Sequence, residues 1–191
     1  EDNPYSKYDP NGRYACVSPD LDCESFEKAM GLARNATESA RLTTPQQENL
    51  KHATGFVGLP NDGNNVIVKF RDDSSRGGYS TFNAKDNTTT LTLRPDKDIK
   101  NLGKNAVHEA EHGYVDAQRG RGDESRTERF ENEVSAYTTQ AYYQDALQYS
   151  TSSDDPWTYT GGTSEQNIAD RAELSVNEAC GNQNTGSCGD P

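Results

Sequence analysis

Hydrophobic residues near the N-terminus recur at helical spacing. The pattern predicts one helix, which Asp22 or Ser25 caps and which runs to about Leu42. Pro45 interrupts the pattern, because proline lacks a backbone N–H and does not fit the interior of a helix. Residues 46–52 then predict a short second helix. This part of the chain is therefore expected to be helical after an irregular N-terminal arm.

Short β-branched runs replace the helical spacing in the next part of the chain. Val66–Phe70 predicts one strand, and Tyr79–Asn83 and Thr88–Leu93 predict two more. Leucine and threonine alternate in the last run, as expected of a strand with one buried face. Because only a short turn separates the last two runs, we expect a small antiparallel sheet.

Three longer helical patterns follow the strands. The first is capped by Asp96 or Asp98 and carries apolar residues at helical spacing to about Val115. A second spans roughly Thr127–Gln148, and a third covers about residues 164–179. A polar loop separates the second helix from the third, so the three are expected to be distinct elements.

Together these elements predict an α+β fold in one domain, residues 1–191. Residues 55–148 form the expected core, in which a small antiparallel sheet packs on the first long helix and a second long helix follows. Residues 1–54 add the N-terminal arm and helices, and residues 149–191 add a loop, a helix and a glycine-rich tail. The length of the chain agrees with a single domain.

The first long helix contains the pattern His-Glu-x-x-His. His108 and His112 are four residues apart, so they project from one face of a helix, one turn apart. Both imidazoles then reach a single tetrahedral Zn²⁺ at about 2.0–2.1 Å. Glu109 would lie beside such a metal rather than on it, where it can take a proton from water as a general base. The alternative is a helix that carries two surface histidines.

A catalytic zinc needs a third protein ligand and one open position. No histidine follows His112, and Asp116 lies too far along a straight helix to bind the same ion, so we place Asp116 beside the ligands. The acidic residues of the next helix remain: Glu128, Glu131 and Glu133. Only Glu133 falls inside the apolar stripe of that helix, and it is the predicted third ligand. The alternative is a glutamate at the edge of the core, bonded to a tyrosine or an arginine.

The motifs on the two helices resemble those of the gluzincin branch of the zincin metallopeptidases. They are His108-Glu109-x-x-His112 and Asn132-Glu133-x-x-Ala136. The layout is also similar to the compact peptidase domains of secreted effectors and toxins, and the resemblance covers about residues 64–148. It implies zinc as the cofactor and peptide bonds as the substrate.

The resemblance implies two further features of the site. An edge strand above the metal helix should pair with an extended peptide, and Thr88–Leu93 or Tyr79–Asn83 would be that strand. A polar side chain should stabilise the oxyanion of the reaction. The tyrosines that are candidates for this role are Tyr137, Tyr142, Tyr143 and Tyr159.

The cysteines indicate how a chain with few hydrophobic residues is stabilised. Only 30% of its residues are hydrophobic, so the core needs support from disulfides, a metal or glycans. The four cysteines contain no CxxC pair, which favours two disulfides over a zinc ribbon. Three pairings are possible, and we predict the local ones, Cys16–Cys23 and Cys180–Cys188.

Charge and sequons indicate where the protein acts. A net charge of −12 and a pI near 4.6 argue against nucleic acid and anionic membranes as partners. No apolar run approaches the length of a bilayer span. Asn35 and Asn87 lie in Asn-x-Thr sequons and predict glycosylation. We expect a mature secreted form that is a monomer.

The combined patterns predict a secreted zinc-dependent endopeptidase, with Glu109 as the base that passes a proton to the leaving amine. Two alternatives remain open. One is a zinc hydrolase that acts on a cell-wall amide or another non-protein bond, since a fold does not select its substrate. The other is a non-catalytic secreted module, in which zinc is structural or absent and the acidic surface binds a partner.

Overall fold

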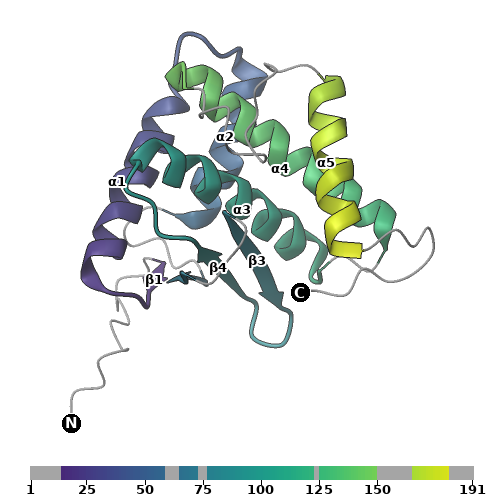
Figure 1. The fold of residues 1–191 in the computed structure, drawn as a ribbon, viewed down its shortest axis with the longest axis horizontal. Coiled ribbons are helices and arrows are strands. Elements are labelled where there is room, and N and C mark those ends of the chain that lie inside the picture. Colours follow the sequence, from purple (N-terminus) through teal and green to yellow (C-terminus); the bar gives the residue numbers. More distant parts are fainter. Residues whose placement is uncertain (1–13, 59–64, 73–76, 123–124, 150–164, 181–191) are drawn as a thin grey trace.

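The computed structural model describes residues 14–58, 65–72, 77–122, 125–149 and 165–180. These residues form an α+β fold of five helices and a mixed four-stranded sheet, so the α+β class that we predicted is confirmed. Helix α3 lies in the middle of the molecule, with the sheet on one side and other helices around it (Figure 1). The strands are β1 Ala15–Cys16, β2 Val66–Phe70, β3 Gly78–Asn83 and β4 Thr88–Leu93, and the helices are α1 Asp20–Ala36, α2 Thr44–Val57, α3 Ile99–Arg119, α4 Arg126–Leu147 and α5 Glu165–Cys180.

The sheet is mixed, so the prediction of an antiparallel sheet was wrong. Its strand order is β1-β2-β4-β3. Strands β3 and β4 form the expected antiparallel hairpin, but β4 also runs parallel to β2, with Val68 opposite Leu91. Alternation of apolar residues reports which face of a strand is buried and not which way the strand runs, so the sequence pattern did not reveal this pairing. Strand β1 was not predicted because it has only two residues.

The first two helices differ from their predicted bounds. Helix α1 follows Pro19 and ends at Ala36 rather than near Leu42. The apolar pattern continues past the end of α1 because Leu42 is buried in the core without being helical. Helix α2 is longer than residues 46–52, since Pro45 lies in its first turn, where the missing N–H costs nothing. The Thr43 backbone N–H donates to the Gln46 side chain at 2.8 Å, which completes a capping box.

Helix α3 is the element on which the others pack. The side chain of Asp98 caps it by accepting from the backbone N–H groups of Lys100 and Asn101, as one of the two predicted caps. The helix ends at Arg119 and is capped by Gly120, whose φ of 71° is left-handed. It contacts α1, α2, α4, β3 and β4. Twelve of the 21 residues of α3 are buried, and its two histidines and two glutamates are among them.

Helices α4 and α5 agree with the predicted elements. Ser125 caps α4 by accepting from the backbone N–H of Glu128 at 3.2 Å. Helix α5 packs on α4 through a small apolar cluster that is separate from the main core. The buried members of this cluster are Tyr137, Ala141, Ile168 and Ala172. Within the described ranges, no helix has both the length and the apolar character of a membrane span.

Of the covalent features, the predicted Cys16–Cys23 disulfide is confirmed. It fastens β1 to helix α1. The predicted Cys180–Cys188 bridge includes Cys188, which lies outside the described residues. The sequon residues Asn35 and Asn87 are both exposed, and their glycosylation stays a prediction.

Candidate metal centre

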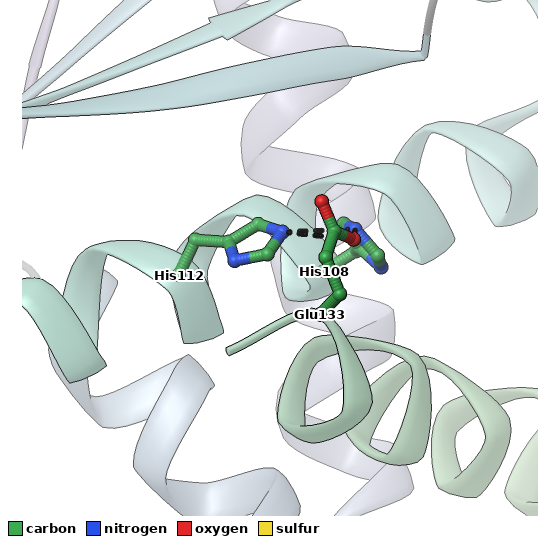
Figure 2. A group of neighbouring side chains, drawn as sticks. All are labelled: His108, His112 and Glu133. Atoms are coloured by element: carbon green, nitrogen blue, oxygen red, sulfur yellow. Dashed lines mark hydrogen bonds and ion pairs between the residues drawn. The ribbon is translucent and has the colours of Figure 1, made fainter. Parts of the chain in front are cut away.

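Two helices bring His108, His112 and Glu133 together. The histidines lie one turn apart on α3, and the Glu133 carboxylate reaches them from α4 (Figure 2). His108 Nε2 and His112 Nε2 are 3.1 Å apart. Glu133 Oε2 lies 3.6 Å from the first of these nitrogens and 3.5 Å from the second. Among the described residues, these three form the group of His, Cys, Asp or Glu side chains that could hold a metal ion.

The triangle of donor atoms has the size of one face of a zinc tetrahedron. Zn–N and Zn–O distances of about 2.0–2.1 Å place neighbouring ligand atoms of a tetrahedron about 3.3–3.4 Å apart. The observed separations of 3.1, 3.5 and 3.6 Å bracket that distance. The three side chains therefore fit a tetrahedral ion with little movement.

The Glu133 carboxylate is buried, and one of its oxygens lacks a hydrogen bond. The residue is only 2% exposed. Its Oε1 accepts from Ser175 Oγ at 2.8 Å and is 3.4 Å from Arg129 Nε. Its Oε2, the atom that faces the histidines, has no hydrogen-bond donor. Because a buried carboxylate oxygen without a hydrogen bond is costly, this atom is suited to pair with a cation, either a protonated imidazole or a metal ion.

The charges of the group are strongly coupled. Burial disfavours the charged form of His112, but the nearby Glu133 carboxylate outweighs this and raises the pKa of His112 to about 9. Burial would also raise the pKa of Glu133, and the neighbouring histidines instead hold it well below its ordinary value. The Glu133 carboxylate thus favours a positive charge at this point of the molecule, which a metal ion supplies as well as a proton.

Hydrogen bonds from Asp116 through Asn132 to His112 determine which nitrogen of the His112 ring carries the lone pair. Asn132 Nδ2 donates to Asp116 Oδ1 at 3.1 Å, so the amide oxygen of Asn132 faces His112. That oxygen is 3.0 Å from His112 Nδ1, which must therefore donate. The lone pair of the neutral ring then lies on Nε2, toward the group. Asp116 acts on His112 through Asn132, in the place beside the ligands where we expected it; the role of Asn132 was missed.

Glu109 lies next to the group without belonging to it. The residue is 6% exposed, and burial raises the pKa of its carboxyl against the opposing charges of His108 and His112. Strand β3 passes close by, because a Cβ on Gly78 would lie 2.9 Å from Glu109 Cγ. The carboxyl group is thus confined between the edge of the sheet and the candidate metal ligands.

The other acidic candidates on α4 lie elsewhere. Glu128 is paired with Arg121, whose Nη2 is 2.6 Å from Glu128 Oε1. The side chain of Glu131 is 65% exposed and lies 4.0 Å from Arg119. Neither residue belongs to the group that Glu133 forms with the histidines.

The four candidate tyrosines separate by position. The ring of Tyr137 is 4.5 Å from the ring of His108 and is 8% exposed. Tyr143 belongs to the main core, where its hydroxyl donates to the carbonyl of Lys100 near the start of α3. Tyr142 packs against the same core, and Tyr159 lies outside the described residues. Of the three candidate tyrosines that the structure describes, Tyr137 is the one with a ring contact to a candidate ligand.

The sheet offers one of the two expected edge strands beside α3. Strand β4 lies between β2 and β3, so the alternative of Thr88–Leu93 as the edge strand was wrong. Strand β3 is at the edge of the described sheet, and it contacts α3. The hairpin pattern did not distinguish the two strands, because either member of a hairpin can join a third strand.

Comparisons with protein families, with curated proteins and with solved structures gave no match to this chain. Its function therefore has to be inferred from the chemistry of the site.

Proposed function

We propose that this chain is a zinc-dependent endopeptidase of the zincin type. In this proposal His108, His112 and Glu133 hold the metal, and Glu109 is the general base. The observation that carries it is the buried triangle of donor atoms, in which Glu133 Oε2 faces two imidazole nitrogens and has no hydrogen bond. A protonated His112 would also pair with that oxygen, so the metal content of the chain distinguishes a metal site from an ion pair.

The donor set favours zinc at a catalytic site. Two imidazoles and one carboxylate are typical zinc ligands, and three protein ligands leave the fourth tetrahedral position open. When bound, zinc would polarise the scissile carbonyl and lower the pKa of water toward about 7. The hydrogen bond from His112 Nδ1 to Asn132 supports this assignment, since it leaves Nε2 free to bind a metal.

Glu109 and Tyr137 are the residues that we propose for proton transfer and for stabilisation of the oxyanion. Glu109 follows His108 directly and lies beside the triangle, so its carboxylate accepts the proton of the attacking water and delivers it to the leaving amine. Tyr137 is the described tyrosine beside His108, and burial raises the pKa of its hydroxyl. It therefore stays a hydrogen-bond donor at neutral pH and is the residue we propose for the oxyanion.

Two further observations support a peptide substrate and secretion. Strand β3 is an edge strand beside Glu109, and an extended peptide can pair with such an edge through backbone hydrogen bonds. The Cys16–Cys23 disulfide agrees with an oxidising compartment outside the cytosol.

The test is metal content and peptide hydrolysis of the purified chain. We expect about one zinc per chain by mass spectrometry, and a melting temperature that falls on chelation. A free metal concentration one hundred times Kd stabilises the folded chain by about 2.7 kcal/mol, so the shift is measurable. Zinc-dependent release of amines from casein, but not from cell-wall polymers, should accompany it.

A matched pair of histidine variants provides the control. His112→Ala should lose zinc, whereas His52→Ala should keep it, because His52 is exposed and outside the group. A wild-type chain that contains no transition metal, and melts at the same temperature with and without chelator, would contradict the proposal.

A further inference from the structure

Helix α5 is attached to the helix that carries Glu133. Its buried residues Ile168 and Ala172 pack on Tyr137 and Ala141 of α4, in a cluster separate from the main core. Figure 1 shows α5 crossing α4 at the side of the molecule opposite to α1. The stability of α5 in place therefore depends mainly on one neighbour, α4.

A polar contact from α5 reaches the candidate metal centre. Ser175 Oγ donates to Glu133 Oε1 at 2.8 Å, across 42 residues of sequence. Arg129 Nε, on α4 itself, lies 3.4 Å from the same oxygen. Both partners hold Oε1, while Oε2 lies 3.6 Å from His108 Nε2 and 3.5 Å from His112 Nε2 (Figure 2). Glu133 is thereby presented to the metal position through a single oxygen.

We infer that Ser175 is a positioning residue for the metal, and that α5 is a clamp whose docking and metal binding stabilise each other. The inference rests on the proposed metal site. When Ser175 holds Oε1, the carboxylate cannot rotate away from the histidines, so less freedom is lost when a metal binds. Coupling between two sites is reciprocal, so a bound metal must stabilise α5 by the same factor.

A second contact between α4 and α5 does not involve Glu133, so it can be removed on its own as a control. Arg126 Nη2 lies 2.7 Å from Glu173 Oε1 and also donates to Asn177, and both partners are on α5. The side chain of Glu173 is 52% exposed. Because exposed ion pairs contribute little, Glu173→Ala should leave most of α5 docked. This variant is a matched control on the same helix.

The first test measures zinc affinity by competition with a chromophoric chelator. Ser175→Ala should weaken zinc binding about 10- to 100-fold, the range found when a partner of a metal ligand is removed. Ser175→Thr restores the hydroxyl and should recover most of the loss, and Glu173→Ala should change the affinity less than about threefold. A role that is only structural would lower the melting temperature of the metal-free chain without this pattern.

The second test is hydrogen exchange of α5 in the wild-type chain, with and without zinc. Exchange over residues 165–180 should slow when zinc is added, and Ser175→Ala should reduce this difference. This measurement also decides the matter if Ser175→Ala fails to fold. Wild-type zinc affinity in a folded Ser175→Ala, or equal exchange of α5 with and without zinc, would overturn the inference.

The outcomes distinguish the clamp from the peptidase. A wild-type chain that binds no zinc overturns both proposals. A chain that binds zinc, loses affinity in Ser175→Ala and cleaves no peptide supports the clamp and rejects the peptidase. Zinc-dependent cleavage with unchanged affinity in Ser175→Ala rejects the clamp alone.

Discussion

Glu131 and Glu133 are two residues apart on α4 and have opposite surroundings. Glu133 is 2% exposed, whereas the Glu131 side chain is 65% exposed. Each residue of a helix is rotated by about 100° from the one before, so two residues apart face nearly opposite directions. One glutamate therefore faces the candidate metal ligands and the other faces solvent.

This difference predicts distinct effects of the same substitution. Glu133→Ala should weaken zinc binding and peptide hydrolysis together, because it removes the proposed ligand. Glu131→Ala should change neither, since its carboxylate is exposed. Zinc per chain and amine release measure both effects. Full zinc in Glu133→Ala, with loss in Glu131→Ala or Asp116→Ala, would show that the third ligand is a different residue.

Substitution of Glu109 separates metal binding from chemistry. Glu109→Gln keeps the shape of the side chain and removes the base, so bound zinc should stay while turnover falls by a factor on the order of 10²–10⁴. Zinc content and kcat measured on the same sample test this. Unchanged turnover would exclude Glu109 as the general base, and lost zinc would mean that Glu109 helps to bind it.

At the scale of elements, the close approach of β3 to α3 requires a glycine. A Cβ on Gly78 would lie 2.9 Å from the Thr92 carbonyl oxygen, from Leu93 Cδ2 and from Glu109 Cγ. Contacts of this length do not occur at a real Cβ, and the carbonyl belongs to the neighbouring strand. The edge strand can therefore reach the helix only because this position has no side chain.

Gly78→Ala should therefore destabilise the fold, by about 1–3 kcal/mol as for other overpacked sites. It should also lower turnover, since Glu109 must shift. Gly31→Ala is the control, because a Cβ there meets nothing within 4 Å and alanine favours a helix by about 0.5–1 kcal/mol. Urea unfolding of both variants gives the comparison. A Gly78→Ala chain as stable as the wild type would contradict the tight packing of β3 on α3.

At the scale of the whole molecule, the disulfide and the proposed metal site lie in different parts. The Cys16–Cys23 bridge joins β1 to α1, whereas the candidate ligands lie on α3 and α4. A loop this short restricts the unfolded chain by roughly 2–3 kcal/mol in the entropy model. That is a large share of a typical stability of about 5–15 kcal/mol.

Removal of the Cys16–Cys23 bridge should therefore lower stability and leave the site intact. We expect a double Cys→Ser variant at these positions to melt at a lower temperature, but to keep its zinc and its turnover at low temperature. Differential scanning calorimetry and zinc analysis measure the two effects. Zinc lost together with the bridge would show that these cysteines act on the metal centre.

The sequence by itself determined the features that depend on residues close together in the chain, namely helices, the spacing of the two histidines and the local disulfide. Helical spacing located α3 and α4, and the same spacing put Glu133 on the buried side of its helix. The prediction that His108 and His112 project from one face followed from their four-residue spacing and the geometry of a single helix. The local bridge Cys16–Cys23 followed from a short separation. Each of these depends on residues within a few turns of one another.

Only the tertiary structure decided how distant segments meet. It made β4 a central strand parallel to β2, and so left β3 at the edge. It placed the ring of Tyr137 against that of His108, and it brought Ser175 to Glu133 across 42 residues. Such contacts have no period in the sequence, because they depend on how whole helices and strands pack and not on the residues beside them.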